Sequence, residues 1–216
     1  MPKSDLTKNK TSTQPLSREI ILAKALHIAD EEGIENVSAR RLAGELGKTA
    51  MALYRHFDSI EEIRFGVVAL AFREVDTAPI PGERWDDTIR RTTASIREMN
   101  LNHRRAHLYL VEGAAWSPAL KEHTDRVQTL HGNQGIPEHI LAPTWRIIDA
   151  FLTGFILNEL TEINNAPHPS SDEPEWMSTV EKAYTDQAFK DGIEIIIAGI
   201  YRLAAPDPCE WYTPQE

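Results

Sequence analysis

Two short helical segments separated by a glycine constrain the fold of this chain more than any other feature of its sequence. Residues 39–46 follow Ser38 as an N-cap and end at Gly47, and residues 50–57 follow Thr49 in the same way. Helices of this length are not stable alone in water, so they need a third helix to pack against. The order of short helix, glycine turn and short helix predicts a helix-turn-helix.

The segment from Ser17 to Gly33 supplies the third helix, because its apolar residues form a broad stripe and Gly33 suits a C-cap. Four apolar side chains of the two short helices are expected to point inward and form a shared core. They are Leu42, Leu46, Leu53 and Phe57. Arg40 and Arg41, at the start of the preceding helix, are expected to flank the second helix. The side chains expected to point mostly outward are Lys48, Thr49, Ala50, Met51, Tyr54 and Arg55.

The rest of the chain also predicts helices and contains no strand pattern of any length. Ser59 and Glu62 match a capping box, which starts a longer helix to about Val75. A Pro- and Gly-containing linker follows at 77–84. The fold class is therefore all-α. The remaining helices are expected at 85–101, 103–113, 118–131, 138–164 and 178–204.

The formal charge of the chain is uneven. The whole chain carries −10, but residues 1–57 hold nine Lys/Arg and seven Asp/Glu, which leaves −12 on the remainder. A mildly basic first quarter on an acidic body permits a small DNA-binding head. Cys209 is the only cysteine and no export signal is evident, so a cytoplasmic location is expected. No common catalytic motif occurs, and the chain is not expected to be an enzyme.

Residues 17–63 resemble the DNA-binding segment of the tetracycline-repressor (TetR) family of bacterial regulators. The resemblance lies in LSREIILAKAL from Leu16, EEGIENVSARRLAGELG from Glu31, and LYRHFDS from Leu53. The L-Y-x-H-F signature after a glycine turn is specific. A looser similarity extends through residues 85–87 and 153–155 into the helical C-terminal half of the family.

The resemblance implies DNA-contacting roles for several residues of the head. Thr49 would cap the recognition helix and bond a phosphate, and Tyr54 and His56 would contact phosphates. Arg40 and the face of Ala50 and Met51 would meet base edges, with Arg55 as a further contact. Ile60 stands where the family usually has a lysine that contacts a phosphate, whereas Lys48 stands where it mostly has a small apolar residue. The DNA-binding residues expected are Arg40, Lys48, Thr49, Ala50, Met51, Tyr54, Arg55 and His56.

Two helices of the C-terminal half, at 143–164 and 188–204, are apolar on almost every side, which is typical of helices buried all round. In a chain of this size that pattern favours a homodimer joined by a four-helix interface, as the resemblance also implies. The alternative is that both helices form the core of one monomer. Two pairs of small residues that would allow close helix contact are Ala150 with Gly154 and Gly192 with Gly199.

The other helices of this half carry aromatic and histidine side chains, which favour an apolar ligand chamber with a few polar groups. The expected ligand-binding residues are His103, His107, Tyr109, Trp116, Trp145, Phe155 and Asn158. Taken singly, each of them is more often an ordinary core residue. His103 and His107 have a spacing that could share a metal, but no carboxylate lies at ligand spacing. We therefore expect no metal and no cofactor.

The sequence thus predicts a ligand-responsive DNA-binding repressor that a small, apolar or aromatic molecule releases from a palindromic operator. The alternative is a helical ligand-binding or interaction protein that has lost DNA binding. The expected divisions are a flexible arm (1–16), a helix-turn-helix domain with its connecting helix (17–76), a ligand-binding and dimerisation domain (77–207) and a tail (208–216).

Overall fold

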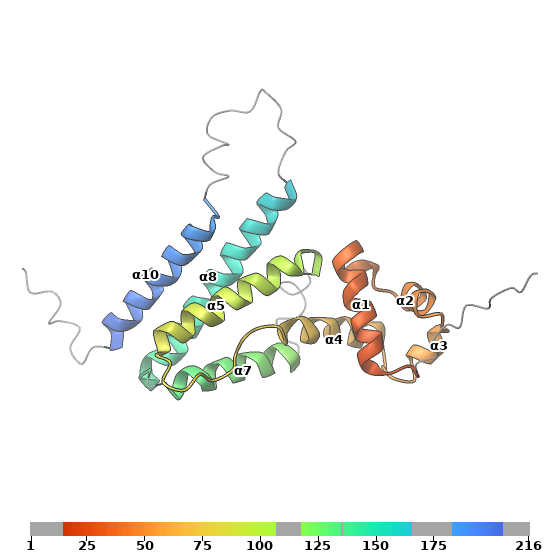
Figure 1. The fold of residues 1–216 in the computed structure, drawn as a ribbon, viewed down its shortest axis with the longest axis horizontal. Coiled ribbons are helices and arrows are strands. Elements are labelled where there is room, and N and C mark those ends of the chain that lie inside the picture. The colour runs from red at the N-terminus through yellow and green to blue at the C-terminus, as the bar shows by residue number, and fades with distance from the viewer. Residues whose placement is uncertain (1–14, 107–117, 135, 166–182, 205–216) are drawn as a thin grey trace, which may run out of the picture.

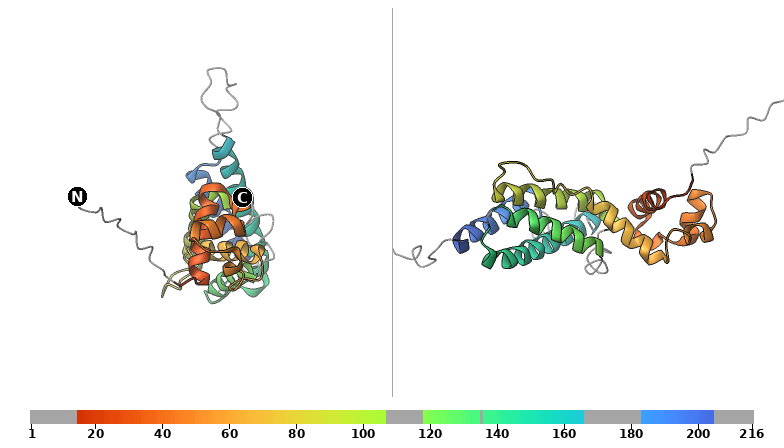
Figure 2. Two further views of the ribbon diagram at one scale, coloured as in Figure 1. Left: turned by 90° about the vertical axis from the view of Figure 1, so that its right-hand side faces the viewer. Right: turned by 90° about the horizontal axis from the view of Figure 1, so that it is seen from below.

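The computed structural model describes residues 15–106, 118–134, 136–165 and 183–204, and this part of the chain is helical without strands. A small head lies at one end and a longer helical body at the other (Figures 1 and 2). The helices are α1 (Arg18–Glu32), η1 (Ile34–Asn36), α2 (Ala39–Leu46), α3 (Ala50–Leu53), α4 (Ile60–Phe72), α5 (Trp85–Asn102), α7 (Pro118–Gly132), α8 (Glu138–Asn165) and α10 (Asp186–Ala204).

Local capping explains where the head helices begin and end. The hydroxyl of Ser17 accepts a hydrogen bond from the amide of Ile20 at 3.3 Å, and that of Ser38 accepts one from the amide of Arg41 at 3.2 Å. Gly33 and Gly47 end α1 and α2 with φ of 97° and 61°, a region that L side chains rarely adopt. These short-range contacts set the turn between α2 and α3.

The helix α3 is shorter than the sequence predicts, since it ends at Leu53 rather than Phe57. The backbone tightens after it, because the amide of His56 donates to the carbonyl of Leu53 at 2.9 Å, a three-residue spacing. The guanidinium of Arg18, on α1, donates to the carbonyl of His56 and lies 3.9 Å from the centre of the Phe57 ring. Arg18 therefore holds this last turn against α1.

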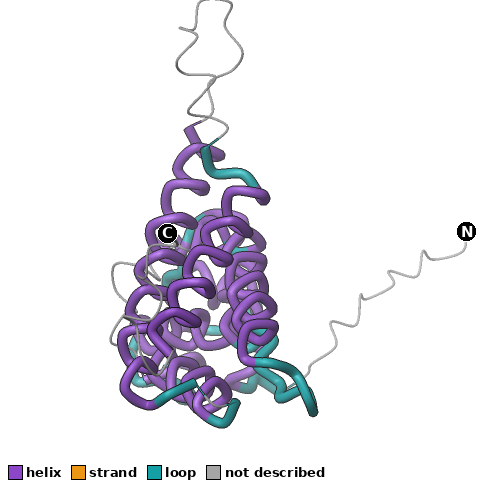
Figure 3. Tube along the Cα trace, turned by 90° about the vertical axis from the view of Figure 1, so that its left-hand side faces the viewer, coloured by secondary structure: helices purple, strands orange, loops and turns teal. Residues whose placement is uncertain are grey.

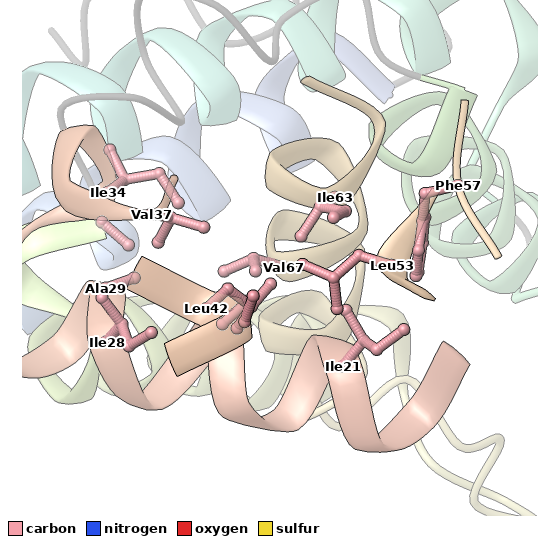
Figure 4. Close-up of a cluster of buried hydrophobic side chains, with 13 residues drawn as sticks. Ile21, Ile28, Ala29, Ile34, Val37, Leu42, Leu53, Phe57, Ile63 and Val67 are labelled. Atoms are coloured by element: carbon pink, nitrogen blue, oxygen red, sulfur yellow. The ribbon is translucent and has the colours of Figure 1, made fainter. Parts of the chain in front are cut away.

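The head has its own hydrophobic core between α1, α2, α3 and α4, as the sequence predicts (Figure 4). Leu42 and Leu53 are fully buried, Phe57 is 2% exposed and Leu46 packs at the edge. The fully or almost fully buried residues labelled in the figure are Ile21, Ile28, Ala29, Ile34, Val37, Leu42, Leu53, Phe57, Ile63 and Val67.

The connection from head to body runs through α4 and an extended linker. The helix α4 ends at Phe72, slightly before the expected residue 75. Arg91 of α5 pins the linker, because it donates to the carbonyls of Asp76 and Ala78 and forms an ion pair with Glu83 at 2.7 Å. The linker is thus attached to the body along its length.

The body packs α5, α8 and α10 around one core, and α7 lies against α4 and α8. Figure 3 shows the helices of the chain in a view toward the body end. Arg97 of α5 reaches Glu159 of α8 at 2.5 Å, and it also contacts Asp186 of α10 at 2.9 Å. The first of these pairs is largely buried, with side-chain exposures of 13% and 8%. It therefore fixes the positions of three helices relative to one another.

One helix prediction for the body differs from the structure. The helix expected at 178–204 begins at Asp186, because Thr185 caps it by accepting from the amide of Ala188 at 3.1 Å. Residues 183–185 are not helical, and 178–182 lie outside the described residues. Of the helix expected at 103–113, residues 104–106 are helical, and 107–113 lie outside the described residues.

Candidate nucleic-acid interface, ligand groove and dimer face

The outer face of the head gathers exposed side chains from α3 and its flanking turns. Met51 is 71% exposed and Tyr54 43% exposed, whereas the intervening Leu53 is fully buried. The other predicted DNA-contacting residues are exposed (Arg40, Lys48, Thr49 and Arg55) or half-buried (Ala50 and His56).

Thr49 begins α3 in the way that the sequence predicts. Its hydroxyl oxygen accepts from the amide of Ala52 at 3.3 Å. A hydroxyl can accept and donate at once, so its proton remains able to reach a phosphate oxygen. The backbone of the neighbouring Lys48 is fixed by its own amide, which donates to the carbonyl of Ala43 at 2.9 Å, while its side chain is exposed.

The structure separates the two adjacent arginines at the start of α2. Arg41 is engaged within the protein, since it pairs with Glu32 at 2.5 Å and with Glu45 one turn later. Hydrogen bonding to Glu32 and then to Glu45 raises the pKa of Arg41 and lowers that of both carboxyls. Arg40 points to solvent with no such partner described, so it is the arginine of the pair that can approach another molecule.

The start of α4 explains why an isoleucine stands at position 60. Ile60 is half-buried and packs against the head core, so it contributes apolar contact instead of a charge. Ser59 caps the helix by accepting from the amide of Glu62 at 3.1 Å. The capping box is only half formed, because the Glu62 carboxylate accepts from the amide of Asp58 at 2.6 Å and from Arg18. The bond from Arg18 and then that from Asp58 lower the pKa of Glu62.

Four of the seven predicted ligand-binding residues lie in the described part of the chain: His103, Trp145, Phe155 and Asn158. Trp145 is half-buried on α8, and Phe155 is buried against Phe151, Tyr184 and Phe189, with ring centres 5.3–5.4 Å away. Asn158 is exposed, and its side chain donates to the carbonyl of Gly154. Three others, His107, Tyr109 and Trp116, lie outside the described residues.

His103 occupies a different place from the expected chamber wall. It ends α5 and is 6% exposed, and both of its ring nitrogens contact carboxylates. Its Nδ1 lies 2.8 Å from Asp30 of α1, and its Nε2 lies 3.1 Å from Glu74, just after α4. Spacing along the chain could not predict these carboxylates, because they are 73 and 29 residues away.

A groove of about 530 Å³ opens between α5 and α10, within the size range of small-molecule sites. Its apolar wall is formed mainly by Ala94, Leu101, Phe189 and Ile193. Its charged rim is formed by Arg90, Arg97, Glu98, Asp186, Lys190 and Glu194.

The charges of the groove compensate one another. Arg90 binds Glu194 through two nitrogens, at 2.6 and 2.8 Å, and Lys190 pairs with Asp186 at 2.7 Å. Sequence reasoning missed this groove, because its walls come from helices far apart in the chain: Arg90 and Glu194, which pair across it, are 104 residues apart. The sequence did contain one indication of the groove: its lining residues recur at intervals of three and four along each helix, which places them on one face.

The outer surfaces of α8 and α10 carry exposed apolar side chains. Ile147 is 57% exposed on α8, while Ile195 and Leu203 on α10 are 73% and 54% exposed. Gly154 and Gly199 also face open space, where an added Cβ would meet nothing within 4 Å.

By length and composition the helix Glu138–Glu162 could cross a membrane, since its mean hydropathy is 1.5. One such helix is weak evidence for a membrane protein, because core helices of soluble proteins have the same composition.

Gly192 does not share the open surface of Gly199, although the sequence groups them on one face. A Cβ at Gly192 would lie 2.4 Å from the ring of Phe151 on α8. The glycine is therefore needed for packing within the chain. Only Gly199 of this pair can admit another helix from outside.

Comparison with known proteins identifies the class to which this head and body belong. The family model described as "Bacterial regulatory proteins, tetR family" matches residues 21–67. The structure of the TetR-family protein ActR from Streptomyces coelicolor with (S)-DNPA has a TM-score of 0.68 and 27% identity, and covers 87% of this chain and 98% of that one. The chain belongs to the TetR family of bacterial regulatory proteins.

Curated relatives match over shorter lengths. The HTH-type transcriptional repressor DrrR1 of Streptomyces coeruleorubidus is 26% identical over 67% of this chain and 54% of its own length. Tetracycline repressor protein class D of Escherichia coli is 31% identical over 41% of this chain and 42% of its own length. The chain thus spans about half the length of the curated relatives it matches first, and the family is regulatory.

Proposed function

We propose that this chain is a transcriptional repressor that acts as a dimer, binds a palindromic DNA operator with its heads and leaves it when a small molecule binds the body. The exposed face around α3 carries the proposal, because it combines cations, hydroxyls and an apolar tip beside a fully buried core. The N-terminal part of the second helix of such a motif enters the major groove.

Each exposed group on this face suits one part of a DNA duplex. Arg40 can form two hydrogen bonds to a guanine, and Met51 can contact a thymine methyl group. Thr49, Tyr54 and His56 suit phosphate oxygens, which position the head without reading sequence. BioQ in complex with its natural double-stranded DNA operator shares this fold at 20% identity and a TM-score of 0.63.

Dimerisation follows from the small size of the head and from the exposed faces of α8 and α10. One head reads only a few base pairs, whereas two heads related by a two-fold axis read half-sites about 34–36 Å apart. Ile147, Ile195 and Leu203 would be buried in the dimer, together with the open surfaces of Gly154 and Gly199. An isologous interface would use each of these residues twice.

The α5–α10 groove is the effector site favoured by the described residues. ActR has been solved in complex with (S)-DNPA and with actinorhodin. The apolar wall of the groove suits an apolar or aromatic molecule. Phe155 packs behind this wall, against Phe189. The molecule must bind the DNA-free arrangement more tightly than the DNA-bound one, because equal affinity shifts nothing.

The test of the whole proposal is binding to the palindromic DNA upstream of the protein's own gene. Full-length protein is titrated against that duplex and against a duplex of equal length with both half-sites scrambled. Saturable binding of one dimer per palindrome is expected, with much weaker binding to the scrambled control. Equal affinity for both duplexes would overturn the proposal.

The second candidate is an interaction protein that has lost DNA binding. Ile60 in the head core, Arg41 held by two carboxylates and the net charge of −10 favour it. Retention on DNA resin at low salt separates the two candidates. A dimeric protein that binds small molecules but passes through the resin would support this second function.

Replacing Lys48 by alanine is expected to weaken DNA binding about equally on all sequences. Lys48 is the exposed cation beside the start of α3, and it would supply the phosphate contact that Ile60 does not. The plot of log affinity against log salt should flatten by roughly 0.9 per contact, or about 1.8 per dimer. An unchanged slope would exclude the phosphate role, and a loss confined to one base pair would assign Lys48 to base reading.

Replacing Ala94 by phenylalanine is expected to leave DNA binding intact but to block release by an effector. Ala94 is an exposed residue that lines the α5–α10 groove, so a larger side chain would fill it. Active compounds are first found by tryptophan fluorescence among apolar aromatic molecules. The concentration of such a compound that releases half of the bound DNA should rise at least about tenfold in the variant. Ala78→Phe, at an exposed linker position, is the matched control. Equal sensitivity of both variants would place the effector elsewhere.

A further inference from the structure

The ring of His103 joins three elements at the junction of head and body. It ends α5, which belongs to the body, and contacts Asp30 in the last turn of α1 and Glu74 just after α4. Three residues later Ala106 is 3% exposed and packs with the hydrophobic core of the head. The end of α5 therefore touches the head at α1 (Figure 1).

Both contacts of the ring can be hydrogen bonds only in one protonation state. An ionised carboxylate accepts and cannot donate, so each ring nitrogen must carry a proton. Burial alone lowers the pKa of His103, but its hydrogen bonds and attraction to Asp30, and then to Glu74, outweigh burial and raise it. The imidazolium is thus the form that the junction stabilises.

The charged groups that face the ring come from both elements packed against it. Asp30 faces it from α1 and Glu74 from the end of α4. Along its own chain, Arg104 and Arg105 follow it and are exposed. When the ring is neutral, one nitrogen keeps a proton and the other presents a lone pair to a carboxylate. That second contact then becomes repulsive, and the junction loosens.

We propose that His103 is a positioning residue, whose protonated ring holds each head in a fixed orientation on the body and thereby tightens operator binding. The inference rests on the proposed function. Two heads must reach their half-sites together, and a junction that is already fixed loses less orientational freedom on binding. His103 is buried at the junction, with only 6% of its surface exposed. Its effect on operator binding would therefore act through the orientation of the head.

The sign of the pH effect follows from the raised pKa. A raised folded-state pKa gives stabilisation that is complete below the ordinary histidine value, and that is lost as pH rises through the folded value. Operator affinity should therefore fall as pH rises through this range. A difference of about half to one unit between the DNA-bound and free pKa corresponds to a change in affinity of about 3- to 10-fold.

The experiment measures the dissociation constant of the full-length protein for its selected palindromic duplex between about pH 6 and about pH 8.5 at constant ionic strength. His56 and other histidines contribute to the slope in every variant, so the comparison is between variants. His103→Gln should lose the 3- to 10-fold part, whereas His27→Gln, an exposed histidine of α1, should keep the wild-type slope. Coincident slopes for wild type and His103→Gln would overturn the proposal.

Two further variants keep the test valid if His103→Gln folds poorly. Asp30→Asn and Glu74→Gln retain a group that can accept from the ring but remove its charge. Each should lower the pKa of His103 in an NMR titration, and each should move the affinity change to lower pH. If neither variant changes the pKa of His103, the proposed contacts of its ring with Asp30 and Glu74 would be contradicted.

A readout without DNA separates failure of this inference from failure of the proposed function. Spin labels are placed at Gly44→Cys in the head and Lys121→Cys in the body, both at exposed positions, in a Cys209→Ser background. The distance distribution should broaden above the pKa of His103 and be broad at every pH in His103→Gln. No broadening in either case overturns the inference, even when operator binding is normal. Broadening without any DNA binding would overturn only the regulatory role and the proposed function.

Discussion

A protein carrying Ile195→Asp is expected to be a monomer that no longer binds its operator. Ile195 is 73% exposed on α10, and the adjacent turn presents Gly199 to open space. In a two-fold symmetric interface the aspartates enter twice, and each unpaired buried carboxylate costs several kcal/mol. The dimer dissociation constant should therefore rise by about a thousandfold or more.

The measurement is sedimentation velocity at about 10 μM beside a DNA titration, since dimer content depends on concentration. Ile80→Asp is the matched control, because Ile80 is 47% exposed in the linker, away from α8 and α10. Both proteins should have the helical content of the wild type. A variant at position 195 that remains a dimer would show that the chains associate through another surface.

Changing two neighbouring residues, Leu53 and Tyr54, to alanine should weaken DNA binding for different reasons: one change should reduce folding stability, and the other should remove a contact to DNA. Leu53 is fully buried in the head core, whereas Tyr54 is 43% exposed. Leu53→Ala should cost ~2–5 kcal/mol of folding free energy, because it removes transfer energy and leaves a cavity. The head has only a small core, so this variant should lose DNA binding by unfolding of the head.

Tyr54→Ala should keep the thermal stability of the wild type while its affinity for DNA falls roughly tenfold or more. A dimer loses two phosphate contacts, each a hydrogen bond of ~1 kcal/mol. Thermal melts and DNA titrations on both variants provide the comparison. A stable Tyr54→Ala protein with full affinity would remove Tyr54 from the interface, and an unchanged melt for Leu53→Ala would contradict the core assignment.

The sequence by itself determined the elements of the head and the all-α class. Ser38, Thr49 and Ser59 each cap the helix that the sequence assigns to them. A cap is a contact across three residues, so the information is complete within a short window. The division of Leu53 to the core and Tyr54 to the surface follows from the helical period in the same way.

The start of α10 and the end of α3 were less predictable. Thr185 was an available cap within the segment expected to be helical, and it begins α10 there. The shortened end of α3 depends on Arg18, which comes from another helix. Helix ends are decided by small energies, and contacts from elsewhere in the chain can shift them by a turn.

Only the tertiary structure decided which side chains meet across helices. It pairs Arg41 with Glu32 and leaves Arg40 exposed, and it packs Gly192 against Phe151. It also joins His103 to Asp30 and opens a groove between α5 and α10, whereas the aromatic pattern of the sequence pointed to other residues. Helical periodicity fixes which residues share a face, but the partner of each face depends on how the helices pack, which is set by contacts between residues far apart in the chain.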